Sequence, residues 1–160
     1  MLVVGPSGPA AAAMPVGTDA RIAFFGMIFL DTSTEGAYFG ARADETARTR
    51  LIEEAVRDRF AEAGYAFMDL APIADTLAQT VNPANCYGCD IRMGKALGAE
   101  YILVGEVQKV SNLILTMNLT LRDVGTGKMV LGRSVDIRSN TDESWLRGIN
   151  YLMTHYFFEE

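Results

Sequence analysis

The sequence predicts an α/β fold, a two-layer sandwich in which a mixed five-stranded sheet carries its helices mainly on one face. Two observations lead to this prediction. A dense apolar run at residues 21–30 precedes an amphipathic segment at residues 46–63, the pattern of a buried strand followed by a helix. Residues 113–122 alternate between apolar and polar side chains, which is typical of an antiparallel strand covered on one face. The 160 residues suit one such domain.

The elements are expected in the order β-α-β-α-α-β-β-β-α. In the first half, Gly64 ends the helix of residues 46–63 because glycine accepts the left-handed conformation. A second strand then follows at residues 65–70, and a short helix at residues 71–80 has Pro72 in its first turn. Two strands joined through a helix are expected to lie parallel.

The second half is expected to form a meander. A short helix at residues 91–97 leads into a strand at residues 101–109, and residues 123–128 form the turn between the strands 113–122 and 129–138. Asn140 and Thr141 cap a last helix, and Glu143, three residues after Asn140, supports its start. Glu106 and Lys109 could line a pocket, but solvated charges at the end of a strand are commoner and are expected here.

Charge and composition exclude several classes of protein. Fourteen Lys and Arg against twenty Asp and Glu give a net charge of −6, which argues against binding to nucleic acid or an anionic membrane. No apolar stretch reaches the roughly 18 residues that a transmembrane helix needs. The single histidine, His155, excludes a His-rich zinc site within one chain, and the familiar phosphate-binding glycine patterns are absent. No catalytic, metal or cofactor site is predicted.

Residues 1–20 are rich in Gly, Pro and Ala and have no helical or strand period. They resemble the back half of a secretory signal with a cleavage position near Ala13, although the basic region that starts such a signal is missing. They are therefore expected to be a signal-peptide remnant or a flexible tail, followed by a single α/β domain at residues 21–160.

The pair Cys86 and Cys89, spaced Cys-x-x-Cys, is the sharpest chemical feature and has three interpretations. In an oxidising compartment the two thiols would form a disulfide. A redox role is the second, because a helix N-terminus lowers a thiol pKa, although Asp90 opposes thiolate formation. The third is half of a metal site completed by a second chain. The structural disulfide is favoured.

Two other groups are candidates for contact with a partner. Tyr38 and Phe39 lie in the long loop of residues 31–46, where exposed aromatic side chains would suit a ligand lid or a partner contact. The same two side chains could equally pack under the following helix. Asp142 and Trp145 belong to a polar stretch beside an aromatic residue, as at interfaces, although a capped helix start with a core tryptophan explains the same residues more simply. His155 is expected to pack at the surface rather than to bind a ligand.

The segment Leu97-Gly-Ala-Glu-Tyr-Ile-Leu-Val-Gly-Glu-Val107, followed by Arg122-Asp-Val-Gly-Thr-Gly-Lys128, resembles bacterial envelope modules of the TolB N-terminal domain, CsgG and LpoB type. From residue 85 to Trp145 the chain is similar to a narrower bacterial family of predicted exported proteins of unknown function. Some of those proteins are encoded near quinoprotein alcohol-oxidation systems. The narrow resemblance covers about residues 21–158 and the broad one about residues 85–138. No lipobox cysteine lies near the start, so lipid anchoring as in CsgG and LpoB is not indicated.

The resemblance implies a non-enzymatic binding or assembly module in the periplasm, used for docking and possessing no cofactor. Its expected partner is another envelope protein. An accessory role to a quinoprotein alcohol-oxidation system is a more specific hypothesis, and a homodimer is also considered. The alternative function is thiol-redox or metal handling through Cys86 and Cys89.

Overall fold

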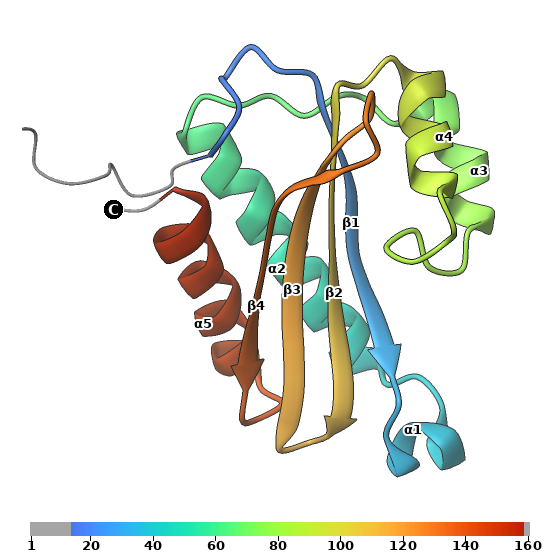
Figure 1. The fold of residues 1–160 in the computed structure, drawn as a ribbon. Helices are drawn as coiled ribbons and strands as arrows, with labels where there is room; N and C mark the ends of the chain where they lie inside the picture. Colours follow the sequence, from blue (N-terminus) through green and yellow to red (C-terminus); the bar gives the residue numbers. More distant parts are fainter. Residues whose placement is uncertain (1–13, 159–160) are drawn as a thin grey trace, which may run out of the picture.

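A computed structural model describes residues 14–158 (Figure 1). Its strands are β1 (Ile22–Asp31), β2 (Tyr101–Ser111), β3 (Ile114–Asp123) and β4 (Met129–Ile137). Its α-helices are α1 (Thr34–Phe39), α2 (Ala43–Glu62), α3 (Ala74–Gln79), α4 (Cys89–Leu97) and α5 (Asp142–Leu152). A 3₁₀ turn at Ala71–Ile73 precedes α3, and a π-helical turn at Met153–Phe157 extends α5.

The four strands form one mixed sheet in the order β1-β2-β3-β4. β1 and β2 pair in parallel, whereas β2, β3 and β4 form the predicted antiparallel meander. The α/β class and the meander are confirmed, but the sheet has four strands rather than five.

The prediction of a strand at residues 65–70 is wrong, because the segment cannot form a continuous ladder with β1. This segment makes only an isolated bridge between Phe67 and Ile22, supported by a 2.9 Å hydrogen bond from the Met68 amide to the Ile22 carbonyl. Further along β1 the register breaks between Phe24 and Met27, and the Met27 amide donates to the Glu53 carboxylate of α2 at 2.8 Å. The neighbouring strand edge is thus occupied by a side chain, and a ladder cannot continue.

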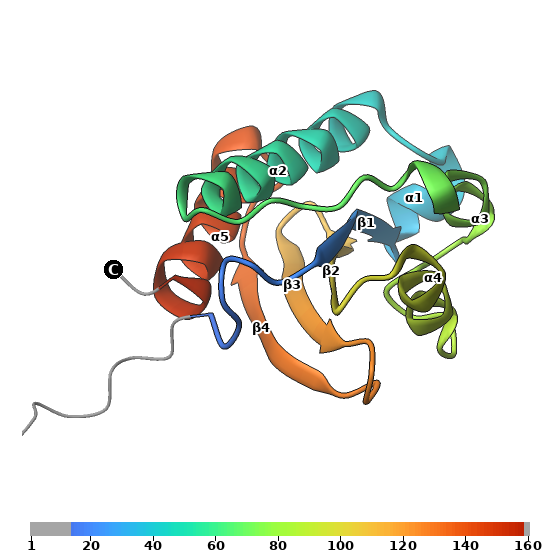
Figure 2. The same ribbon diagram turned by 90° about the horizontal axis from the view of Figure 1, so that it is seen from above.

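Helices cover both faces of the sheet rather than mainly one (Figure 2). α2 and α5 lie on one face, over a core that contains Phe24, Phe60 and Trp145. On the other face α3 and α4 cover β1 and β2, around Phe25 and Met93. This second cover stops at β2, so the same face of β3 and β4 is left without a helix.

Residues 14–20, part of the expected tail, lie against the domain. Met14, Val16 and Ala20 pack against the core that α2 and α5 cover, and the Tyr65 hydroxyl donates to the Val16 carbonyl. The predicted cleavage position near Ala13 lies outside the described residues.

Candidate functional site

A buried ion pair lies at the end of the sheet where β2 turns into β3. Lys109 of β2 is 0% exposed, and its Nζ lies 2.7 Å from Oε2 of Glu45, which is 1% exposed. Glu35 and Asp31 follow at 3.4 Å and 3.9 Å from the same nitrogen. The lysine thus joins the end of β1, the short helix α1 and the first turn of α2.

Asn140 extends this pair to α5. Its Nδ2 donates to Oε2 of Glu45 at 2.8 Å, while its Oδ1 accepts from Nε1 of Trp145 at 3.0 Å and from Arg48 at 3.2 Å. One amide therefore connects the loop after β4 to α2 and to the buried indole.

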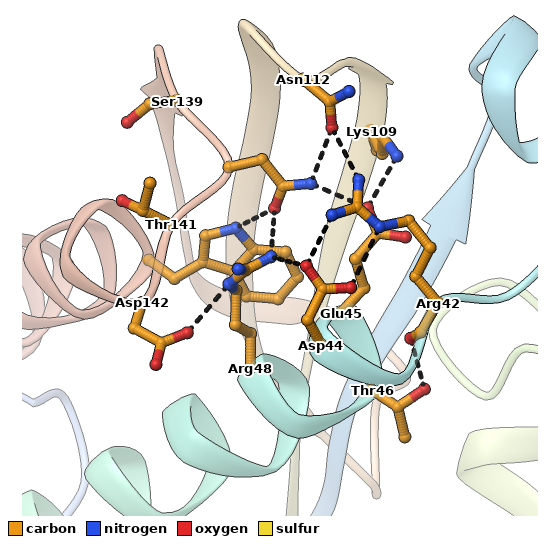
Figure 3. Close-up of polar contacts among 12 residues, drawn as sticks. Arg42, Asp44, Glu45, Thr46, Arg48, Lys109, Asn112, Ser139, Thr141 and Asp142 are labelled. Carbon is orange, nitrogen blue, oxygen red and sulfur yellow. Dashed lines mark hydrogen bonds and ion pairs between the residues drawn. The ribbon is translucent and has the colours of Figure 1, made fainter.

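An outer ring of polar contacts closes the network. Arg42 binds Asp44 with two hydrogen bonds, at 3.0 Å and 2.6 Å, and Arg48 binds the same carboxylate at 2.9 Å. Asn112, in the turn between β2 and β3, donates to Glu35 at 2.7 Å and accepts from Arg42 at 3.2 Å. We call eight of these residues the polar network, and Figure 3 labels six of them, Arg42, Asp44, Glu45, Arg48, Lys109 and Asn112. The other two members are Glu35 and Asn140.

The charges of the polar network stabilise one another. Burial alone would lower the pKa of Lys109, but the hydrogen bond and charge of Glu45, the charge of Asp31 and the hydrogen bond to Glu35 raise it above its ordinary value. The hydrogen bond from Asn112 lowers the pKa of Glu35, and Lys109 adds to this effect. These contacts favour the charged form of Lys109, through which β1, α1 and α2 are held together.

Exposed apolar side chains cover this same end of the molecule. Phe39 and Tyr38 of α1 are 81% and 79% exposed, and Leu113 in the β2–β3 turn is 69% exposed. Because Asn112 binds Glu35, the polar network fixes the turn against α1 (Figure 1). We call this region the end surface; it comprises Tyr38, Phe39, Val110, Leu113 and Ile114.

The structure places the predicted contact residues in different environments. Tyr38 and Phe39 are exposed rather than tucked under the helix, and they lie on helix α1 rather than in a loop. Asp142 is largely exposed and accepts from Arg48 at 2.9 Å. Trp145 is completely buried, so its indole offers no surface to a partner and instead holds Asn140.

The start of α5 differs in detail from the prediction. Thr141 is the N-cap and forms a capping box with Ser144, whereas Asn140 and Glu143 do not make the cap. Asn140 is thereby left free to enter the polar network. His155 stacks on Tyr151 with ring centroids 4.3 Å apart.

Sequence reasoning missed the centre of the polar network. Lys109 was expected to be solvated, yet it is completely buried, and Glu45 falls outside the predicted helix because α2 begins three residues earlier than expected. The alternation of side chains along β2 could have indicated that Lys109 is buried. Leu103, Val107 and Lys109 alternate on one face of β2, and this spacing places the lysine on the core side.

The loop before α4 carries the cysteine pair. The sulfur atoms of Cys86 and Cys89 lie at bonding distance, and Tyr87 between them is 97% exposed with a positive φ of 55°. Asn82 at the start of this loop donates to Glu106 of β2 at 3.0 Å. The loop therefore forms one wall of a polar hollow of about 450 Å³ on the uncovered face of the sheet.

The described part of the chain lacks two kinds of feature, a cluster of metal ligands and a membrane-spanning helix. Within residues 14–158 no three His, Cys, Asp or Glu side chains gather as metal ligands would. None of the helices described there is both long and apolar enough to cross a bilayer.

Comparison with known proteins decides the family. The chain matches DUF3280, described as a protein of unknown function (DUF2380), over residues 20–157. The chain belongs to the DUF3280 family. This confirms the expected membership of a family of unknown function. No curated protein matches the chain.

Several solved structures share the fold of this DUF3280 chain. The LpoB C-terminal domain from Escherichia coli has a TM-score of 0.56 at 15% identity, covering 79% of this chain and 88% of that one. The PelC dodecamer from Paraburkholderia phytofirmans has a TM-score of 0.51 at 13% identity, covering 93% and 96%. Lipoprotein GNA1162 from Neisseria meningitidis has a TM-score of 0.50 at 17% identity, covering 77% and 83%. At these identities the likeness concerns the fold.

Proposed function

We propose that this DUF3280 protein is a non-enzymatic binding and assembly module of the bacterial cell envelope, acting in the periplasm and contacting its partner through the end surface. The observation that carries the proposal is the exposure of Tyr38, Phe39 and Leu113 at the end of the molecule where a hydrogen bond from Asn112 to Glu35 joins the β2–β3 turn to α1. The fold it shares with an LpoB domain, a lipoprotein and the subunit of a dodecamer supports an envelope role.

Physical chemistry explains why this arrangement suits binding. Clustered exposed apolar side chains are uncommon on a monomer and usually mark an interaction site. Aromatic residues contribute strongly at such sites because they bury a large area and lose little conformational entropy. The contacts from Glu35 to Asn112 and Lys109 hold α1 in place before a partner arrives, which reduces the entropy lost on binding.

Site-specific photocrosslinking tests the end surface in the host that makes the protein. A photoreactive phenylalanine analogue at Phe39 is expected to give one dominant adduct with an envelope protein, identified by mass spectrometry. The same analogue at Gln79, an exposed position on α3, serves as the matched control. The adduct from position 39 should weaken about tenfold or more when Tyr38→Ser is added, since an interface anchor commonly contributes at least 1.4 kcal/mol.

Adduct identity also tests the finer proposal that the partner is a quinoprotein of an alcohol-oxidation system, which rests on the family resemblance alone. Equal labelling from positions 39 and 79, or an adduct that is insensitive to Tyr38→Ser, would remove the end surface as the contact.

A second candidate function, thiol-redox or metal handling, is favoured by one observation: Cys89 is the first residue of α4 and is close to Cys86. For the exported protein we expect both thiols to resist alkylation until a reductant is added, because a bonded pair in an oxidising compartment is stable. Intact mass before and after reduction measures this. Immediate alkylation of both thiols would contradict a structural disulfide and favour the redox or metal function.

A further inference from the structure

The two edge strands of the sheet, β1 and β4, differ in how far their outer backbone groups are paired. Beside β1, the Phe67 bridge, the Met68 amide and the Glu53 carboxylate occupy groups of the strand's outer edge. Beyond β4, at the other end of the strand order, no further strand pairs among residues 14–158 (Figure 2). An unpaired strand edge presents N–H and C=O groups that can pair with another chain. On β4 the Gly132 carbonyl already accepts from the Arg133 guanidinium at 2.8 Å, a contact that pairing with another strand would replace.

The usable part of the β4 edge is seven residues long. Register shifts at the start of the strand, where Arg122 pairs with Met129 but Leu121 pairs with Leu131, so Val130 is the extra residue of a bulge. From Leu131 to Ile137 the pairing with β3 is regular. This stretch contains no proline, and Arg133, Ser134 and Asp136 within it are exposed.

We propose that β4 pairs antiparallel with β4 of a second copy of this chain, about a twofold axis through Ser134, so that the two sheets become one. Centring on Ser134 pairs the whole regular stretch: Leu131 lies opposite the second copy's Ile137, and Arg133 lies opposite its Val135. Centring on Arg133 would place two guanidinium groups face to face, which is destabilising. A shift of one residue would turn core-facing side chains to the wrong face.

The surface beside β4 fits a folded second copy. A hollow of about 330 Å³ lies between β4 and α5, lined by Val135, Ile137, Gly148 and Tyr151 among others. Within one chain Arg133 already lies 5.6 Å from the ring centroid of Tyr156, on this same face. In the proposed register the second copy's Arg133 lies over this hollow and near Tyr151, an arrangement that favours cation–π contact.

The size of the contact indicates a folded copy rather than a free peptide. Seven residues span roughly 24 Å at about 3.4 Å each, and such a narrow strand contact alone falls short of the roughly 800 Å² per partner of a standard interface. A second copy adds its own α5 beside the first, across Arg147 and Tyr151. The resulting interface is at the small end of specific contacts, so the dimer is expected to dissociate in the micromolar range.

Sedimentation equilibrium from about 1 to 100 µM tests the association. The protein is expected to pass from monomer to dimer over this range. Ser134→Lys should remain monomeric because two lysines meet at the axis, whereas Gln79→Lys on α3 makes the same charge change and should dimerise normally. Mixing Ser134→Lys with Ser134→Glu should restore a heterodimer. A wild-type monomer at all concentrations, or equal dimerisation of both lysine variants, would overturn the proposal.

Cysteine crosslinking tests the register and the twofold axis. Ser134→Cys should form an interchain disulfide under mild oxidation, because residues directly opposite in an antiparallel pair have Cβ atoms roughly 5 Å apart. Asp136→Cys should not form this disulfide, since residue 136 lies opposite Gly132 of the second copy. The cysteine at position 136 of the second copy is then four residues away along its strand. Equal crosslinking by both variants would overturn the Ser134 axis. Photocrosslinking at Phe39 concerns a different surface, so failure there and failure here are distinguishable.

Discussion

Replacing Lys109 with methionine is expected to lower the free energy of unfolding by about 3–5 kcal/mol, the usual cost of leaving one partner of a buried ion pair uncompensated. Methionine fills a similar volume, but Glu45 would remain 1% exposed without its cation. One oxygen of that carboxylate, Oε1, already has no hydrogen-bond partner among the described residues. Urea denaturation followed by circular dichroism measures the change, with the m-value confirming that unfolding stays two-state.

The double variant Lys109→Met with Glu45→Met separates the cost of one unpaired buried charge from the cost of changed packing. Because neither charge remains buried, most of the stability is expected to return, and a nonadditive cycle of roughly 2 kcal/mol or more would follow. Additive costs in the double variant, or a single-variant cost below about 1 kcal/mol, would show that the ion pair is not the centre of this end of the fold.

Replacing Trp145 with alanine is expected to cost about 3–5 kcal/mol, because a large buried side chain leaves a cavity that the fold fills only in part. The indole is completely buried and lies 5.7 Å from Phe29 between ring centroids. It also supplies one of the two described donors to Oδ1 of Asn140, the other being Arg48.

Trp145→Phe is the control for the hydrogen bond. Phenylalanine retains most of the apolar volume and lacks the N–H, while Arg48 still donates to Asn140, so the expected cost is about 1–2 kcal/mol. Thermal unfolding of the three proteins in the same buffer ranks them. If the phenylalanine variant is as unstable as the alanine variant, packing is not the main contribution of Trp145.

Local periodicity was a reliable guide wherever a segment's own contacts decide its structure. The alternation at residues 113–122, the turn before β4 and the helical stripe of α5 all correspond to observed elements. The start of the second helix was predicted less well than its existence. α2 begins at Ala43 rather than at residue 46, because Asp44 and Glu45 in its first turn are stabilised by the helix dipole and by charges from other elements.

The candidate site was predictable only in part. Tyr38 and Phe39 were proposed as candidate contact residues from their place between two glycines. The short helix that carries them forms because Ser33 caps it, with its hydroxyl accepting from the Gly36 amide at 3.0 Å. Whether these side chains face solvent or tuck under α2 depends on contacts to Asn112 and Lys109, which lie more than seventy residues away.

By itself the sequence determined the α/β class, the meander, the acidic charge and the proximity of Cys86 and Cys89, because each follows from residues close together in the chain. Only the tertiary structure decided that residues 65–70 do not join the sheet, that Lys109 is buried, and that Asn140 belongs to a network rather than to a helix cap. The physical reason is the same in each case. A strand edge, a buried charge and a free amide are satisfied by partners that folding brings from distant segments, and no local pattern specifies those partners.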